Sequence, residues 1–266
     1  MDELRIKYRP KRFSDIVGLG PEFESVLQRL AKNNPHAGFE YEAHFGGGKT
    51  SVAIVTAQSI LCTGRKEGSA EPCLECPACK NFEADPFRSF GFYQYVYVDC
   101  TRLEKIKLKK YLYDINNYRF MNSGSKRLVF LFDEFHRTPE PVQELFLNPL
   151  ETKSNAVFIF CIATEHKNFM EPALSQRLLK IEINTPRIEE IVQLMTKVCD
   201  EEAARVEDSR LLEDIGEFAG KNPRLCLNIL GECLILAADN GRIINERIVD
   251  TILKRNQKLP PPTYRR

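Results

Sequence analysis

Residues 43–50, Ala43-His44-Phe45-Gly46-Gly47-Gly48-Lys49-Thr50, decide how the rest of the chain is interpreted. They end in the Gly-Lys-Thr of a phosphate-binding loop, in which glycines let backbone N–H groups turn inward around phosphate oxygens. Lys49 would reach the β- and γ-phosphates, and the Thr50 hydroxyl would bind Mg²⁺. The helix that begins here would add the positive end of its dipole beneath the anion. One position departs from the G-x-x-x-x-G-K-[ST] pattern, because Ala43 stands where a glycine is usual.

The segments on either side of this loop follow the order that a phosphate-binding site requires. Before it, Phe39-Glu40-Tyr41-Glu42 predicts a short strand, although two glutamates are unusually polar for a buried central strand. After it, residues 49–61 place apolar side chains at helical spacing and predict an amphipathic helix. Glycine runs also occur in ordinary loops, so the rest of the chain has to decide between the two interpretations.

A second anchor is the run of five apolar residues at 128–132, which ends in Asp133 and Glu134. Such a run predicts a buried parallel strand that delivers its carboxylates to the C-terminal edge of a sheet. There Asp133 would join the Mg²⁺ shell, and Glu134 would polarise a water for attack on the γ-phosphate. An isolated Asp-Glu pair is uninformative, but behind a wholly apolar strand it specifically indicates an ATP site.

Further strands are predicted at 93–99, 156–163 and 179–183. Thr164 follows the second of these, beside the expected position of the γ-phosphate, with an ordinary turn residue as the alternative. After Asn184 the pattern is entirely helical. We therefore predict an α/β fold in three parts: a P-loop core with a parallel sheet at 1–184, a small all-α domain at 185–255 and a Pro-rich flexible tail at 256–266.

Four of the nine cysteines cluster behind the predicted helix, as Cys62 and then Cys73-x-x-Cys76-x-x-Cys79. Two-residue gaps let neighbouring thiolates converge on one ion, and the upstream cysteine completes a tetrahedron. We predict a closed structural zinc site in an insertion over about residues 62–80, with reactive or incidental cysteines as the alternative. Because the other cysteines are scattered and the total is odd, a reducing cytoplasm explains them better than a disulfide framework.

Composition excludes several classes of protein. The net charge of +1 provides no overall electrostatic attraction to nucleic acid. The content of 43% hydrophobic and 28% charged residues is ordinary for a globular protein. No apolar run approaches the roughly 20 residues of a membrane span, and the N-terminus is no signal peptide. We therefore expect a cytoplasmic protein without a membrane partner. The lysines at 105–110 form either a solvated helix face or a contact for DNA or a partner.

With these parts in order, the chain resembles the AAA+ clamp-loader ATPases, in particular the gamma/tau subunits of bacterial DNA polymerase III. The resemblance covers residues 7–255. It rests on the lead-in at 8–18, the phosphate loop, the four-cysteine insertion, Asp133-Glu134-Phe135-His136 and the helical C-terminal domain. In that family the insertion binds zinc, and the helical domain acts as a lid.

The resemblance implies roles for individual residues. Catalysis would involve Glu134, Thr164 as the sensor 1 residue, and Arg177. The last matches an arginine finger offered to a neighbouring subunit, once one inserted residue is allowed in Ser175-Gln176-Arg177. The remaining nucleotide contacts are implied for Tyr8, Arg9, Val17, Gly46, Gly47, Gly48, Lys49, Thr50, Ser51, Asp133 and Arg224, the last as sensor 2.

The implied activity is an ATP-driven assembly switch that uses ATP, Mg²⁺ and Zn²⁺. Its partners would be other AAA+ subunits, primer-template or duplex DNA, and a sliding clamp or another replication protein. Three departures limit the transfer: Ala43, the altered finger segment, and a chain that ends before the family's collar domain. They motivate an alternative, a hydrolytically weak nucleotide-binding scaffold in a replication, transposition or phage-defence complex. A zinc-dependent nucleic-acid binder with a vestigial loop is a third hypothesis.

Overall fold

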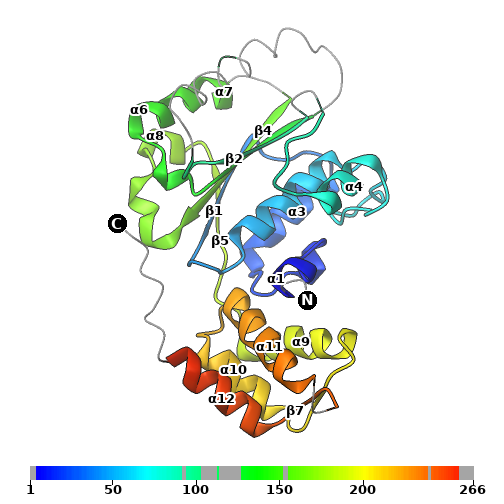
Figure 1. Cartoon of the computed structure of the whole chain (residues 1–266). Helices are drawn as coiled ribbons and strands as arrows, with labels where there is room; N and C mark the ends of the chain where they lie inside the picture. The colour runs from blue at the N-terminus through cyan, green and yellow to red at the C-terminus, as the bar shows by residue number, and fades with distance from the viewer. Residues whose placement is uncertain are drawn as a thin grey trace. The chain divides into compact units, whose positions relative to one another are not determined.

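The structure is a computed structural model that describes residues 4–91, 94–102, 113, 127–151, 155–238 and 241–257. Its contacts divide the chain into two units, Pro10–Asn184 and a helical unit that joins Met1–Arg9 to Thr185–Arg266 (Figure 1). The sequence placed residues 1–9 with the core. They group with the helical unit because Leu4 is buried against Gly231. The lysines at 105–110 and nearly all of the predicted tail lie outside the described residues.

The larger unit is built on five parallel strands in the order β2-β3-β4-β1-β5. The strands are β1 (Gly38–Ala43), β2 (Tyr95–Asp99), β3 (Leu128–Asp133), β4 (Ala156–Ala163) and β5 (Leu179–Glu182). The alternation and the apolar runs therefore predicted the strands correctly. Parallel pairing brings the ends of β1, β3 and β4 to one edge of the sheet, where the chain turns into functional segments.

Helices cover both faces of this sheet (Figure 1). On one side lie α2 (Glu24–Ala31), α3 (Lys49–Leu61) and α4 (Pro77–Ala84), and on the other lie α6 (Glu140–Gln143), α7 (Leu147–Glu151) and α8 (Pro172–Ser175). Short 3₁₀ turns complete the unit: η1 (Phe13–Asp15), η2 (Pro21–Phe23), η3 (Phe135–Arg137), η4 (Glu144–Phe146) and η5 (Thr164–Phe169). The apolar spacing over 139–151 predicts a single helix, but the segment is a succession of α6, η4 and α7, in which Pro141 and Pro149 lack the N–H that a regular helix would use.

Stacked phenylalanines form the core under α6–α8. Phe130 stacks on Phe158 with ring centroids 5.6 Å apart, and Phe132 stacks on Phe160 at 5.5 Å. Phe146 meets Phe160 edge-on at 5.2 Å. Each such pair contributes about 0.5–1.5 kcal/mol beyond its area burial. This packing fixes β3 and β4, and hence the residues that follow them.

The helix after the phosphate loop differs from the prediction. The sequence predicts an amphipathic α3, but every residue of α3 except Thr50 and Ser51 is buried. Its outer face is covered by the segment that holds the cysteines, where Ser59 Oγ donates a 2.5 Å hydrogen bond to the carbonyl of Ala70. The small polar residues that made the helix look amphipathic are satisfied inside the fold.

The two glutamates of β1 are buried, in a strand that is paired on both sides. Glu40 accepts a 2.8 Å hydrogen bond from Ser175 Oγ, and Lys180 Nζ lies 3.9 Å from it. Burial raises the pKa of Glu40 to about 7, although the hydrogen bond from Ser175 opposes the shift. The polar alternation therefore belongs to a central strand whose carboxylate anchors α8.

The helical unit contains α1 (Leu4–Lys7), α9 (Ile188–Glu201), α10 (Arg210–Phe218), α11 (Pro223–Ala237) and α12 (Glu246–Gln257). Asn222 caps the N-terminus of α11, since its Oδ1 accepts a 3.1 Å hydrogen bond from Leu225 N. The sequence predicts no strand here, but β6 (Arg205–Val206) and β7 (Ile243–Ile244) pair in parallel. Two-residue strands are too short to leave a periodic pattern.

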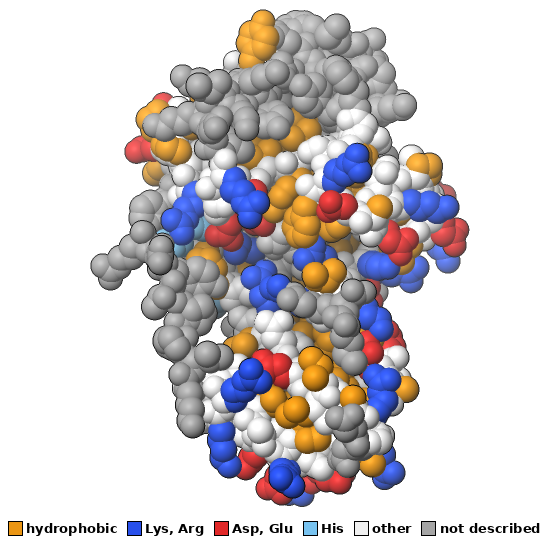
Figure 2. All heavy atoms as spheres, in the orientation of Figure 1, with side chains coloured by type: hydrophobic (Ala, Val, Ile, Leu, Met, Phe, Trp, Pro, Cys, Tyr) orange, Lys and Arg blue, Asp and Glu red, His pale blue; other side chains and the backbone are white. Residues whose placement is uncertain are grey.

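The surface agrees with the nearly neutral composition. Figure 2 shows basic and acidic side chains interspersed on the visible face of the described residues. Apolar side chains also gather on the helical unit around α11, where Leu225, Ile235 and Leu236 are exposed. No helix in the described part of the chain is both long and apolar enough to cross a membrane.

Candidate functional site

The glycine loop joins β1 to α3 without strain at Ala43. Ala43 is the last residue of β1, pairs with Ala163 of β4 and is 1% exposed, so its strand conformation suits any small side chain. The positive φ angles fall instead at Gly46 (77°) and Gly48 (94°), a region that side chains oppose. A Cβ on the intervening glycine would lie 3.0 Å from a backbone oxygen. The departure at Ala43 therefore leaves the shape of the loop intact.

Lys49 lies at the start of α3 and is ion-paired with Glu134. Its Nζ is 2.8 Å from Glu134 Oε1, and its side chain is 7% exposed. The Nζ also lies 5.2 Å from the ring centroid of Phe45. Glu134 follows β3 with a φ of 53°, which turns its side chain toward the loop. The two motifs that the sequence separates by about 80 residues thus meet at one edge of the sheet.

Asp133 receives three kinds of hydrogen bond. Thr50 Oγ1 lies 3.1 Å from both of its carboxylate oxygens, Tyr97 donates from its hydroxyl at 3.1 Å, and the amide of Glu134 donates at 3.1 Å. Burial raises the pKa of Asp133, while the positive charge of Lys49 opposes the shift. A hydroxyl and a carboxylate that converge are the hard oxygen ligands that suit Mg²⁺. Tyr97 belongs to no sequence motif, and the pairing of β2 with β3 brings it beside Asp133.

Thr164 begins η5, directly after β4, and its Oγ1 is buried without a hydrogen-bond partner in the structure. Such a hydroxyl needs a partner, and a phosphate oxygen would satisfy it. Histidines surround the same turn. His44 Nδ1 lies 3.1 Å from Glu165 Oε1, and the rings of His136 and His166 stack with centroids 4.5 Å apart. Thus η5 contacts both the glycine loop and the segment after β3.

Three predicted nucleotide contacts lie in the other unit. Tyr8 donates from its hydroxyl to Glu202 Oε1 at 2.9 Å, Arg9 follows it, and Arg224 is exposed on the first turn of α11. Val17 belongs to the larger unit and is half-buried, and Ser51 follows Thr50 in α3. The nucleotide roles of these five residues remain predictions.

The predicted finger residue, Arg177, is held within its own subunit. Its Nε donates to Glu151 Oε1 at 2.9 Å, a second guanidinium nitrogen also contacts Glu151, and Nη1 donates to the carbonyl of Ala173 at 2.6 Å. Gln176, the residue before it, is exposed. In this conformation the segment presents Gln176 outward, and Arg177 would have to leave Glu151 to reach a neighbour.

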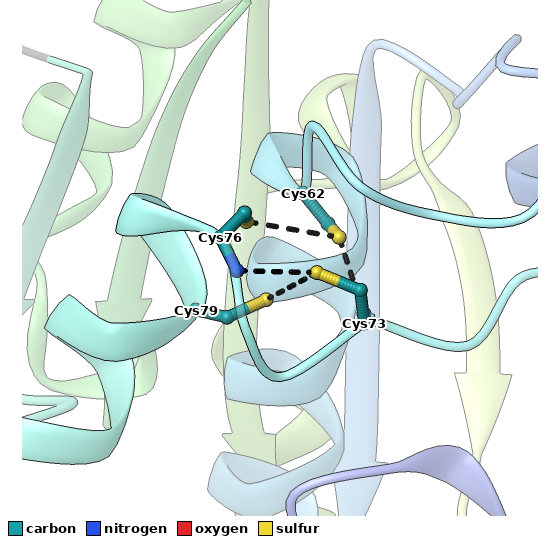
Figure 3. A group of neighbouring side chains, drawn as sticks. All are labelled: Cys62, Cys73, Cys76 and Cys79. Carbon is teal, nitrogen blue, oxygen red and sulfur yellow. Dashed lines mark hydrogen bonds between the residues drawn. The ribbon is translucent and has the colours of Figure 1, made fainter.

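The four clustered cysteines converge as predicted (Figure 3). In this cysteine cluster, Cys62, Cys73, Cys76 and Cys79, all sulfur atoms lie within 4.8 Å of one another. Two pairs are 3.9 and 4.0 Å apart, close to the edge of about 3.8 Å in a tetrahedron with 2.3 Å zinc–sulfur bonds. The cluster therefore fits a zinc ion.

Backbone amides prepare this cluster for thiolates. The amides of Glu75 and Cys76 donate to Cys73 Sγ at 3.4 and 3.3 Å, and they lower the pKa of Cys73. Burial raises the pKa of Cys76, but hydrogen bonds from the backbone of Cys79 and Thr63 outweigh it and bring the value to about 6. Leu74 adopts a φ of 65° in this turn, a strained value for a branched residue. The turn thus favours the thiolate form of Cys73 and Cys76, whereas burial raises the pKa of Cys62 and Cys79, whose protons a bound metal would have to displace.

Comparisons with known proteins agree with this geometry. No protein-family model matches the chain. A DNA polymerase III subunit tau/gamma from Haemophilus influenzae is 26% identical over 247 residues, which are 93% of this chain and 34% of that protein. A DNA polymerase III subunit tau from Bacillus subtilis is 24% identical over 232 residues, which are 87% and 39% of the two chains.

Among solved structures, the Thermotoga maritima RuvB Holliday junction branch migration motor matches with a TM-score of 0.63 and 16% identity, covering 93% of this chain and 72% of that one. The chain has the AAA+ fold. It resembles the tau/gamma subunits of bacterial DNA polymerase III over most of its length, and it spans about a third to a half of those relatives.

Proposed function

We propose that this AAA+ chain binds and hydrolyses ATP as a subunit of a clamp-loader-like DNA replication complex. The observation that carries the proposal is the convergence of Lys49 and Thr50 with Asp133 and Glu134 at one edge of the sheet. The similarity to tau/gamma subunits supports the replication context. Because the chain spans only part of the length of those relatives, we infer its activity and partners from the site. We do not transfer the full activity of the relatives to this chain.

Each residue of the site has a distinct task. The amides of the glycine loop and the ammonium of Lys49 would bind the phosphates, and Thr50 with Asp133 would hold Mg²⁺, which neutralises phosphate charge when bound. Glu134 would accept a proton from the attacking water once Lys49 turns to the γ-phosphate. Thr164, whose hydroxyl is otherwise unpaired in the described structure, would donate to a γ-phosphate oxygen.

Assembly would couple ATP to neighbouring subunits. Arg177 would exchange its contact with Glu151 for the phosphate of an adjacent subunit, and Arg224 would contact the nucleotide as the sensor 2 residue. Such contacts with the γ-phosphate exist only before hydrolysis, so ATP shifts the population of the assembled state. The partners would be other AAA+ subunits, primer-template or duplex DNA, and a sliding clamp or another replication protein.

The cysteine cluster would bind structural zinc rather than act in catalysis. All four ligands come from the protein, which leaves no open coordination position for a substrate. The cluster lies against α3, away from the residues that would contact phosphate. Its thiols are free in the structure, which suits the reducing cytoplasm that we expect for this chain.

An ATPase assay with and without primed DNA tests the proposal. The wild-type chain should bind ATP in a Mg²⁺-dependent manner and turn it over, with a higher rate when partners and DNA are present. Glu134→Gln should retain binding and lose turnover. Absence of Mg²⁺-dependent ATP binding by the wild-type chain would contradict the proposed function.

A second candidate is a hydrolytically weak scaffold that binds nucleotide in a replication, transposition or phage-defence complex. The exposed Gln176 and the retention of Arg177 by Glu151 favour it, because a subunit without a free finger would not stimulate its neighbour. The departure at Ala43 does not favour the scaffold, because Ala43 lies unstrained in β1. The same assay separates the candidates, because a scaffold would bind ATP with negligible turnover in every assembly.

A further inference from the structure

Tyr97 on β2 contacts the proposed Mg²⁺ ligand, although it belongs to no motif. Its hydroxyl donates a 3.1 Å hydrogen bond to Asp133 Oδ2. When a metal binds, Thr50 would direct its hydroxyl oxygen toward the metal. Tyr97 can keep its hydrogen bond to Asp133 both with and without the metal. A partner of this kind fixes the rotamer of a metal-binding carboxylate before the metal arrives.

The phenol of Tyr97 is a permanent donor. An ionised carboxylate can only accept hydrogen bonds, so the hydroxyl of Tyr97 must be the donor in this contact. Asp133 is itself only 9% exposed, so water cannot readily replace a lost hydrogen bond. Loss of the hydroxyl would therefore free one oxygen of Asp133 to rotate.

The segment at 85–90, which follows the cysteine cluster, holds Tyr97 in position. The ring of Phe87 packs edge-on against Tyr97 with centroids 5.0 Å apart. Ser89 Oγ accepts a 3.0 Å hydrogen bond from the backbone N–H of Tyr97. The same segment is fastened to β2 a second time, because the Tyr95 hydroxyl donates to the carbonyl of Pro86 at 2.9 Å.

This segment is in turn continuous with the cysteine cluster. It leaves the end of α4, whose Phe82 packs on Tyr95 with ring centroids 4.6 Å apart. The same short helix begins directly after Cys76 and carries Cys79, which is 1% exposed. The helix α4, the segment at 85–90 and their contacts with β2 therefore connect the metal-binding cysteines to Tyr97 and Asp133.

We propose that Tyr97 is a positioning residue for the Mg²⁺-binding carboxylate of Asp133, and that the metal-bound cysteine cluster holds Tyr97 in place through residues 85–90. The cluster would thus stabilise the nucleotide site as well as its own loop. This inference rests on the proposed function, since it assigns Asp133 to Mg²⁺.

The first test compares Tyr97→Phe with Tyr41→Phe. Both variants lose one hydrogen-bonded tyrosine hydroxyl from the same sheet, but the Tyr41 hydroxyl contacts Thr56 at 3.0 Å, not Asp133. Mn²⁺ affinity is measured by electron paramagnetic resonance in the presence of ADP, together with ADP affinity without metal. Tyr97→Phe should weaken Mn²⁺ binding about ten-fold, within the range for lost partners of metal ligands, and leave metal-free ADP binding unchanged. Tyr41→Phe should leave both unchanged.

The second test addresses the cysteine cluster. Phe87→Ala removes the packing on Tyr97 at a residue that is 40% exposed, so the fold should tolerate it. It should weaken Mn²⁺ binding in the wild-type background and have little further effect in Tyr97→Phe. Removal of zinc with a chelator should likewise weaken Mn²⁺ binding in the wild-type background and have little further effect in Tyr97→Phe. Both zinc removal and Phe87→Ala act through Tyr97.

Two results would overturn the inference. Equal Mn²⁺ affinity in Tyr97→Phe and Tyr41→Phe would show that the hydroxyl does not position Asp133. Additive effects of Phe87→Ala and Tyr97→Phe would show that the segment at 85–90 does not act through Tyr97. Either result leaves the proposed function standing if the wild-type chain binds ATP with Mg²⁺, whereas failure of that binding would remove both.

Discussion

Lys49 and Glu134 neutralise each other across the site, with 2.8 Å between the ammonium and the carboxylate. In the proposed function the lysine binds the phosphates and the glutamate accepts a proton from the attacking water. ATP would then have to separate the pair, because the γ-phosphate would take the lysine and leave the glutamate free. The ion pair would keep the proposed general base inactive until the nucleotide is in place.

Glu134→Gln should uncouple binding from hydrolysis. The amide cannot accept the proton of the attacking water, so turnover should fall by at least about 100-fold. The same change removes the competitor for Lys49, so ATP affinity should be equal to or a few-fold higher than that of the wild type. Fluorescent-nucleotide titration and a phosphate-release assay measure the two quantities. A loss of affinity equal to the loss of rate would contradict this role for the ion pair.

Arg177 and Glu151 give a test of the finger. If Arg177 acts on a neighbour's nucleotide, Arg177→Ala should lower ATP turnover in the assembled state by up to about 10³-fold, with little effect on ATP binding. Glu151→Gln should release the arginine and raise turnover. Arg187→Ala is a matched control, because Arg187 also pairs with a glutamate on the surface but lies outside the segment. Unchanged turnover in Arg177→Ala would favour the scaffold.

The sequence predicted the strands and the site motifs of the larger unit because each leaves a strong local signal. The short apolar run at 128–132 favours a buried strand, and Gly46 and Gly48 occupy backbone conformations that few other residues tolerate. The cysteine spacing likewise predicted a convergent cluster, since two-residue gaps constrain the geometry directly.

What the sequence could not predict depends on contacts between distant segments. The burial of α3 comes from the cysteine segment that covers it, and the position of residues 1–9 comes from the packing of Leu4 on Gly231. Tyr97 was missed for the same reason, because its partner Asp133 lies 36 residues away on another strand. Propensity and periodicity describe residues that are neighbours in the sequence. These contacts join residues that are far apart in the sequence, so local patterns do not reveal them.

Zinc should be a stabiliser of the cysteine cluster. Cys76→Ser removes one thiolate and should lower the zinc content from about one per chain toward zero, with a lower unfolding temperature. Cys100→Ser is the control, since Cys100 is buried outside the cluster and should leave zinc content unchanged. Metal analysis by mass spectrometry and thermal denaturation measure the effects. Full zinc content in Cys76→Ser would exclude the four-thiolate site.

The raised pKa of Glu40 predicts that stability depends on pH, and one substitution can isolate this contribution. Burial raises its pKa from 4.5 to about 7, so the folded chain binds this proton more tightly than the unfolded chain. Between pH 4.5 and 7 the folded state therefore holds more protons at this group, and its contribution to stability falls as the pH rises. Above pH 7 the cost is complete, roughly 3 kcal/mol.

Glu40→Gln should remove this contribution, because the amide does not titrate and can still accept the hydrogen bond from Ser175. The difference in free energy of unfolding between Glu40→Gln and the wild type should increase from pH 4.5 to 7 in favour of the variant and then level off. Urea denaturation at several pH values measures it, and taking the difference cancels the titration of other groups. A pH-independent difference would mean that Glu40 stays ionised, with Lys180 rather than a proton neutralising its charge.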